Sequence, residues 1–202
     1  MQNKETTGIH IEGHLKIYDP TSNEVYVNKR NAIHYENMSI ALASSIANRG
    51  QGFIYKMGFG NGGTAVDPTG IITYLTPNSA GSNSSLYNET FTKVVDDNSK
   101  NNLDPARNYI DSRHTVGKNY TDVFITCLLD YSEPAGQNAF DTSISNDGLF
   151  VFDEIGLKSF SDTGNELLLT HVIFHPVQKS LNRLIQIDYT VRIQSLTGIT
   201  GV

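Results

Sequence analysis

Apolar and polar residues alternate strictly along the segment 185–194, close to the end of the chain. One side of this segment carries only apolar residues, namely Ile185, Ile187, Tyr189, Val191 and Ile193. A period of two over ten residues is typical of a strand with one buried face. The preceding segment, 167–175, is apolar on both sides, as in a strand that is covered on both faces. We expect these strands to form one antiparallel hairpin over 167–193, with a polar corner at 176–183.

The same alternation predicts further strands. Residues 9–17 form the first, and after a turn at 19–23 the segment 25–27 returns, which is the pattern of a hairpin. The other predicted strands cover 53–59, 86–95, 109–116, 123–131 and 149–157. About eight strands separated by turn residues, with a single helix, predict a mainly β protein built as an antiparallel β-sandwich. An open β-barrel is the alternative.

One helix is predicted in the N-terminal half, at about 32–48. Asn31 can cap its first turn with the side-chain oxygen. Four apolar residues then follow at helical spacing, which places them on one face: Tyr35, Met38, Leu42 and Ile46. Gly50, which follows Arg49, is expected to end the helix in a left-handed conformation. We expect the apolar face to pack against a sheet.

Two long polar segments interrupt the strand pattern. The segment at about 60–85 is rich in Gly, Ser and Asn and contains an apolar island at 71–75, which predicts a short strand. Loops of this length are usually functional or ordered by a partner. We therefore expect residues 64–85 to be functional or ordered by a partner. The segment 133–147 is the second, with one helical turn expected near Phe140.

Composition narrows the classes of function. The 202 residues fit one domain, 1–202. A net charge of −6, with no basic cluster larger than Lys29-Arg30, argues against nucleic acid as a partner. No apolar run is long enough for a membrane span, and the first residues lack the apolar core of a secretory signal. The single cysteine, Cys127, is expected to be a small buried hydrophobe. These features predict folding in a reducing cytoplasm.

One motif suggests a nucleotide cofactor. Gly58-x-Gly60-x-x-Gly63 matches the dinucleotide fingerprint and follows a predicted strand. The fingerprint needs a helix directly afterwards, because the helix N-terminus holds the pyrophosphate. Pro68 and Gly70 interrupt any such helix. We instead expect a glycine-rich turn that uses positive φ and close backbone approach, and no cofactor.

Metal-ligand patterns also fail on geometry. His10 and His14, and likewise His171 and His175, are four residues apart. Four residues of a strand span about 13 Å, whereas zinc–nitrogen bonds are about 2 Å long, so neither pair can share a metal. Asp96-Asp97-Asn98 begins like a calcium loop. It then has Asn101 at the sixth position and Arg107 at the twelfth, where an EF-hand needs Gly and Glu. No metal site is predicted, although a looser calcium site among these acids stays open.

No catalytic residue is predicted either. The chain lacks a Gly-x-Ser-x-Gly elbow and any Cys–His motif. Asp153 and Glu154 are neighbours on a predicted strand and should point to opposite faces, which is poor geometry for joint acid–base work. A hydrolase whose two carboxylates come from distant strands remains an alternative. A carbohydrate-binding module is another, with an aromatic platform limited to Tyr74, Tyr87 and Tyr109 and no Trp.

Three blocks of the chain, taken in their order, resemble small virion structural proteins of tailed bacteriophages. The first is the glycine-rich block Phe53-Ile-Tyr-Lys-Met-Gly-Phe-Gly-Asn-Gly-Gly-Thr64, and the second is Phe152-Asp-Glu-Ile-Gly-Leu157. The third is the closing pair Leu168-Leu-Thr-His-Val-Ile-Phe-His-Pro-Val177 and Ile187-Asp-Tyr-Thr-Val-Arg-Ile193. Together they cover about half of the chain.

This resemblance implies a non-enzymatic structural component of a phage tail, baseplate or neck. Such a subunit would assemble in the host cytoplasm with copies of itself, as a symmetric homo-oligomer, and with other virion proteins. The resemblance transfers no catalytic, cofactor or metal residue to this chain. A capsid decoration protein and a receptor- or carbohydrate-binding fibre module are the alternatives.

Overall fold

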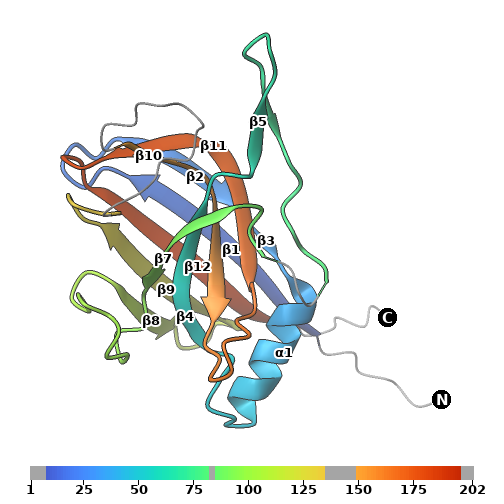
Figure 1. Cartoon of the computed structure of the whole chain (residues 1–202). Coiled ribbons are helices and arrows are strands. Elements are labelled where there is room, and N and C mark those ends of the chain that lie inside the picture. Colours follow the sequence, from blue (N-terminus) through green and yellow to red (C-terminus); the bar gives the residue numbers. More distant parts are fainter. Residues whose placement is uncertain (1–7, 82–84, 135–148, 197–202) are drawn as a thin grey trace.

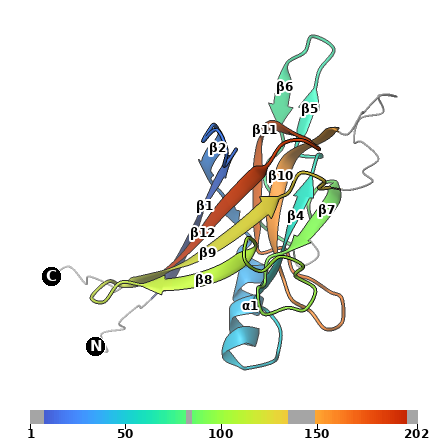
Figure 2. The ribbon, with the colours of Figure 1, turned by 90° about the vertical axis from the view of Figure 1, so that its left-hand side faces the viewer.

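The computed structural model describes residues 8–81, 85–134 and 149–196. Two five-stranded antiparallel sheets pack face to face, with 51% of the chain in strands and 7% in helix (Figures 1 and 2). This arrangement confirms the predicted mainly β fold and is consistent with a β-sandwich.

The first sheet has the order β2-β1-β12-β9-β8. Its strands are β1 (Gly8–Tyr18), β2 (Val25–Arg30), β8 (Tyr109–His114), β9 (Tyr120–Leu129) and β12 (Ile185–Leu196). The second sheet has the order β3-β11-β10-β4-β7. Its strands are β3 (Ala32–Ile33), β4 (Ile54–Gly60), β7 (Glu89–Val94), β10 (Leu149–Ser159) and β11 (Thr170–Ser180). A third, two-stranded sheet pairs β5 (Thr64–Val66) with β6 (Ile72–Tyr74).

The predicted terminal hairpin is wrong, although both of its strands exist. β11 pairs with β10 and β3 in the second sheet, whereas β12 pairs with β1 and β9 in the first. The chain therefore crosses between the sheets after Ser180, and β11 continues through Pro176 instead of turning there. Alternation reveals which face of a strand is buried, but it does not reveal the neighbouring strand, and here the two strands face each other across the core.

Burial in the core follows the predicted alternation. Ile185, Ile187, Tyr189 and Val191 are at most 2% exposed, and the residues between them are half-buried. Aromatic rings of the second sheet meet them, with Phe152 packed edge-on against Phe59 and Phe174. Residues 170–174 of β11 are all buried, as expected for a strand covered on both faces. The outer cover of this strand is the loop that carries Asn78 and Tyr87.

The helix α1 (Tyr35–Ile46) is shorter than predicted, and only part of the predicted face is buried. Met38 is buried and Leu42 packs against the core, as predicted. His34, rather than Asn31, caps it, because its Nδ1 accepts a hydrogen bond from the Asn37 backbone N–H at 3.2 Å. Residues 32–33 are instead strand β3, paired with β11. The buried positions are Asn37, Met38 and Ala41, whereas the predicted stripe residues Tyr35 and Ile46 are 71% and 83% exposed.

The end of α1 also departs from the prediction. Ala47 caps the helix, the last turn contains no basic residue, and Asn48 already has positive φ before Gly50 does. Within the described residues, no helix has the length and apolar character needed to cross a membrane.

The remaining strand predictions are confirmed with shifted ends. β1 and β2 form the predicted hairpin, and β4, β7, β8, β9 and β10 lie within a few residues of the expected segments. The apolar island at 71–75 contains β6, as predicted, but β5 pairs with it and was not anticipated. The helical turn expected near Phe140 lies outside the described residues.

Candidate functional site: the projecting arm and its buried anchor

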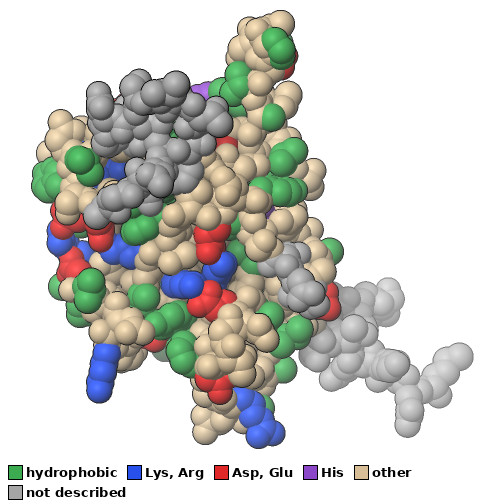
Figure 3. All heavy atoms as spheres, viewed as in Figure 1, with side chains coloured by type: hydrophobic (Ala, Val, Ile, Leu, Met, Phe, Trp, Pro, Cys, Tyr) green, Lys and Arg blue, Asp and Glu red, His purple; other side chains and the backbone are tan. Residues whose placement is uncertain are grey.

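A β-hairpin projects from one end of the sandwich. It consists of residues 64–75, which we call the arm, and its strands β5 and β6 pair with each other (Figures 1 and 2). Four apolar side chains of the arm are largely exposed: Val66 (65%), Ile71 (61%), Tyr74 (53%) and Leu75 (44%). Hydrophobic side chains are visible on the arm in the space-filling view (Figure 3). Exposed apolar side chains gathered on a projecting element are typical of an interaction surface.

The tip of the arm is ordered by its own turn chemistry. The Asp67 carboxylate accepts hydrogen bonds from the Thr69 hydroxyl at 2.6 Å, the Thr69 N–H at 2.8 Å and the Ile71 N–H at 2.9 Å. The Thr69 hydroxyl bond is the main reason that the pKa of Asp67 is lowered. Gly70 takes φ of +87°, which a side chain would resist. The tip therefore has a defined shape before any partner binds.

Two neighbouring carboxylates hold the beginning of the arm. Asp153 accepts hydrogen bonds from the Gly63 and Thr64 N–H groups, each at 2.9 Å, and from the Thr64 hydroxyl. Glu154 accepts one from the Gly62 N–H at 3.1 Å. Three consecutive amides, at residues 62–64, are thus bound by side chains of β10. Both carboxylates are buried, at 3% and 0% exposure.

The same Glu154 holds the segment by which the chain returns from the arm. Its carboxylate accepts hydrogen bonds from the Asn88 N–H at 2.8 Å and the Tyr87 N–H at 2.9 Å. His171 Nε2 lies 2.9 Å from Oε2, the carboxylate oxygen that also accepts the Tyr87 N–H. His171 Nδ1 in turn accepts a hydrogen bond from the Asn78 N–H at 2.8 Å. We call Asp153, Glu154 and His171 the anchor.

The hydrogen bonds of His171 assign its tautomer. Nδ1 accepts from a backbone N–H, which can only donate, so Nδ1 carries no proton and Nε2 donates to Glu154. The imidazole is neutral in this arrangement. It is fully buried, and the Tyr87 ring packs against it with centroids 5.7 Å apart. The loop that carries Asn78 and Tyr87 is therefore the outer cover of β11.

The two carboxylates of the anchor differ in their electrostatics. For Glu154, burial raises the pKa, but the bonds from His171 and from the three backbone N–H groups outweigh it, so the pKa is lowered. For Asp153, burial dominates over the bonds from Thr64 and Gly63, and its pKa is raised. The fold therefore stabilises the negative charge of Glu154 more than that of Asp153.

The prediction that Asp153 and Glu154 point to opposite faces is wrong. The register of β10 against β11 shifts between Phe152 and Glu154, which marks a bulge in the strand. A bulge re-aims side chains locally, and here both carboxylates reach the same turn. A sequence pattern cannot place a bulge, but two acids inside the apolar run 149–157 were a signal that buried donors lay opposite.

The glycine-rich motif serves this anchor. Gly58 and Gly60 lie within β4, and strand β5 follows the motif, so no helix stands where a dinucleotide would need one. The expected positive φ is wrong for these glycines, none of which has it. The expected close approach is confirmed: a Cβ on Gly60 would lie 2.5 Å from the Asn88 carbonyl oxygen and would also collide with Glu154.

The other candidate ligands are dispersed. His10 and His14 both lie on β1, and His171 and His175 both lie on β11. Each pair is therefore about 13 Å apart along its strand and cannot share a metal ion. Asp96 and Asp97 accept hydrogen bonds from the backbone N–H groups of Asn98 and Ile110, at 3.0 and 3.3 Å. In the described part of the chain, no three His, Cys, Asp or Glu side chains gather as a metal site.

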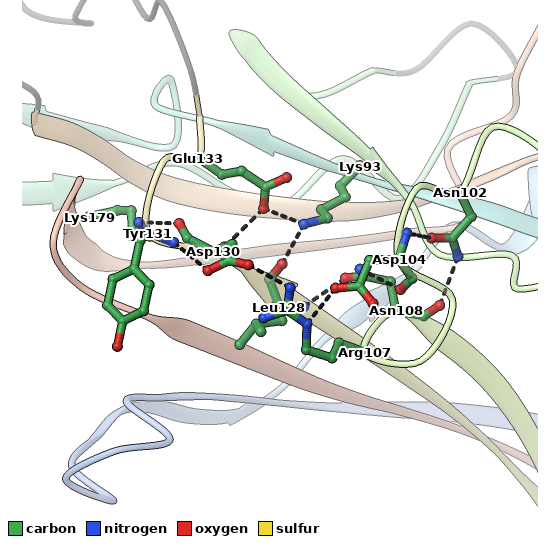
Figure 4. A network of polar contacts seen from close by, with 10 residues as sticks. All are labelled: Lys93, Asn102, Asp104, Arg107, Asn108, Leu128, Asp130, Tyr131, Glu133 and Lys179. Carbon is green, nitrogen blue, oxygen red and sulfur yellow. Dashed lines mark hydrogen bonds and ion pairs between the residues drawn. The ribbon is translucent and has the colours of Figure 1, made fainter.

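A second polar network ties the second sheet to the loops beside β9 (Figure 4). Lys93 of β7 forms an ion pair with Glu133 and donates to the Leu128 carbonyl oxygen at 2.6 Å. Arg107 bridges Asp104 and Asp130, with 2.6 Å between its Nη2 and the Asp130 carboxylate. Each charge in this network meets an opposite charge or a backbone carbonyl, which is the arrangement of a structural clasp.

Two residues with strongly shifted pKa values prove inaccessible. Lys179 is 1% exposed, burial lowers its pKa to about 8, and its Nζ donates to the Asp130 and Ser180 carbonyl oxygens at 2.8 Å each. A lysine with a lowered pKa suits a nucleophile, but this amine has no room for a substrate. Cys127 is fully buried, as predicted, and burial raises the pKa of its thiol to about 12.

The three tyrosines considered for a carbohydrate platform do not share one surface role. Tyr74 belongs to the arm, where its hydroxyl lies 3.2 Å from His175 Nδ1. Tyr87 packs on the anchor, and its hydroxyl donates to the Thr76 carbonyl oxygen at 2.7 Å. Tyr109 is half-buried at the start of β8.

The comparisons with protein-family models, with curated proteins and with solved structures found no match. The candidate site is therefore defined by its geometry alone. Its centre is an apolar arm whose two ends are fixed to the sandwich by one buried carboxylate–imidazole pair.

Proposed function

We propose that this chain is a non-enzymatic structural subunit that assembles through protein–protein contacts, of the kind that builds the tail, baseplate or neck of a tailed-phage virion. The projecting apolar arm is the observation that carries this proposal. It offers apolar surface at a distance from the sandwich, which suits contact with a neighbouring subunit.

The anchor supports the same proposal. A loop of this length would lose much conformational entropy when a partner ordered it. Here the buried bonds at residues 62–64, 78 and 87–88 order both ends of the arm in advance. Pre-organisation of this kind raises affinity because less freedom is lost on binding. The assignment to a virion rests on the resemblance of the three sequence blocks.

The test is the oligomeric state of the purified chain, measured by light scattering after size exclusion. We expect a discrete oligomer that the double variant Val66→Ser/Ile71→Ser converts to a smaller species, because both substitutions remove apolar surface from the arm. Leu103→Ser is the matched control, since Leu103 is 97% exposed but lies in the loop before β8. A wild-type chain that stays monomeric up to high concentration would overturn the proposed assembly.

A second test distinguishes between the possible locations of the chain within a virion. An antibody against the chain is applied to particles purified from cells that encode it, and the label is located by electron microscopy. Label on the tail, baseplate or neck supports the proposal, whereas label on the head surface favours capsid decoration. Absence of label combined with binding on a glycan array would replace the proposal with a carbohydrate-binding module.

A further inference from the structure

An apolar cleft opens beneath α1. The helix lies at the end of the sandwich opposite the arm (Figures 1 and 2). Its volume is about 550 Å³, within the range of pockets that bind ligands or inserted side chains. The walls combine α1 with both sheets and include Met38, Leu42, Ile54, Ile110, Val123 and Ile193. Most of these side chains are only half-buried, so the cleft exposes apolar surface.

The rim of the cleft is acidic. Asp96, Asp97 and Asn98 line it. The carboxylates of Asp96 and Asp97 each accept one backbone hydrogen bond, and among the described residues neither forms an ion pair. An occupant that complements this cleft therefore has an apolar group next to a positive charge.

The arm and the turn between β8 and β9 both project from the sandwich and carry exposed apolar side chains, and charge distinguishes them. The arm has Asp67 as its charged residue, which the acidic rim would repel. The turn between β8 and β9 carries Val116, which is 93% exposed, and the exposed Lys118 two residues later. No ion partner of Lys118 lies within the described ranges 8–81, 85–134 and 149–196.

The β8–β9 turn cannot fold back into its own cleft. Asn119 holds it to the end of β12, because its carbonyl oxygen accepts from the Ser195 N–H at 2.8 Å and its side chain donates to the Ser195 carbonyl at 2.9 Å. Val123 lines the cleft and pairs with Ser112, and Val116 lies four residues beyond Ser112, about 13 Å further along the hairpin. Figure 2 shows this turn reaching well beyond α1.

We propose that the cleft beneath α1 receives the β8–β9 turn of a second copy of this chain, with Val116 against the apolar walls and Lys118 against Asp96 and Asp97. Each copy has both the turn and the cleft, so two copies related by a two-fold axis make the contact twice. The arm stays free at the opposite end for other contacts. This inference rests on the proposed self-assembly and specifies one of its interfaces.

Disulfide trapping tests the contact directly. Val116→Cys and Asn98→Cys chains are mixed and oxidised; the native Cys127 is fully buried, so the introduced thiol is the reactive one. We expect a mixed Val116→Cys/Asn98→Cys dimer, and no dimer when Val116→Cys is mixed with Thr69→Cys, which places the thiol on the arm tip. The absence of the first product overturns the inference.

Charge reversal tests the chemistry of the rim. Lys118→Glu should weaken dimerisation on the order of tenfold, and Asp97→Lys added to it should restore affinity. All these positions are exposed, so circular dichroism should show an unchanged fold. If Val66→Ser/Ile71→Ser abolishes association while Lys118→Glu leaves it unchanged, this inference fails and the proposed function stands. A wild-type monomer at all concentrations overturns both.

Discussion

His171 Nε2 lies 2.9 Å from Glu154 Oε2, and both side chains are completely buried. Because His171 also accepts the Asn78 N–H and Glu154 accepts those of Gly62, Tyr87 and Asn88, one side-chain pair fixes the chain on both sides of the arm. A buried pair stabilises a fold when its remaining hydrogen-bonding positions are filled, as they are here.

Glu154→Gln should lower the free energy of unfolding by about 3 to 5 kcal/mol, because an amide cannot accept all four hydrogen bonds that the carboxylate accepts. Asp153→Asn is the matched control. Burial raises the pKa of Asp153, so the fold stabilises its charge less than that of Glu154, and we expect a smaller loss of about 1 kcal/mol. Urea unfolding at neutral pH measures both, and equal losses would contradict the special role of Glu154.

The pKa direction of Glu154 also predicts a dependence on pH. Its folded pKa lies below the ordinary value of 4.5, so the stability from its charge is present above that value. As the pH falls below 4.5, the unfolded chain takes up the proton first, and this stability is lost. Wild type should therefore lose more stability than Glu154→Gln between pH 5 and pH 3. Parallel curves from urea titrations at each pH would contradict this.

His171→Phe should keep an aromatic ring next to Tyr87 but remove both hydrogen bonds of the imidazole. We expect a loss of about 2 to 3 kcal/mol and faster amide hydrogen exchange at Asn78, whose N–H loses its acceptor. His175→Phe is the control on the same strand, because His175 is exposed and contacts only the Tyr74 hydroxyl among the hydrogen bonds described. Unchanged exchange at Asn78 in His171→Phe would contradict the assigned tautomer.

Gly60→Ala should destabilise the fold by about 3 kcal/mol, because the new methyl group would lie 2.5 Å from the Asn88 carbonyl oxygen and against the Glu154 carboxylate. Gly8→Ala is the control, since the nearest atom to its methyl group would be 3.8 Å away in Leu196, and it should change stability by less than about 0.5 kcal/mol. Thermal unfolding compares the two. A tolerated Gly60→Ala would mean that the turn can move away from β10.

Cys127→Ala should reduce the amount of folding stability that is lost at alkaline pH. The folded pKa of the thiol is raised to about 12 from 9.0. The stability that the buried thiol contributes is therefore fully present below pH 9 and is lost as the pH rises from 9 towards 12. Between pH 8 and 10.5, wild type should lose about 2 kcal/mol more than the variant. Comparing the two chains cancels the contributions of Lys179 and the tyrosines. Equal losses would mean that the thiol is accessible to solvent.

Local pattern predicted the elements well and their partners poorly. Alternation identified β12 and its buried face correctly, because one face of a half-buried strand is apolar wherever the strand lies. It could not tell that β11 belongs to the opposite sheet. The helix face was partly misjudged for a related reason: Asn37 is buried because its side chain donates to the Leu168 carbonyl oxygen at 2.9 Å, a partner that is distant in sequence.

Local sequence was enough to predict the mainly β class, most of the strands, the buried state of Cys127 and the failure of the dinucleotide motif. These depend on properties of neighbouring residues, such as side-chain period and helix-breaking Pro68 and Gly70. The meeting of Asp153, Glu154 and His171 with the glycine-rich turn, the arm at 64–75 and the cleft under α1 could be seen only in the folded chain. They arise from a bulge and from hydrogen bonds between distant segments, such as the one between Asn78 and His171, 93 residues apart, which no local pattern encodes.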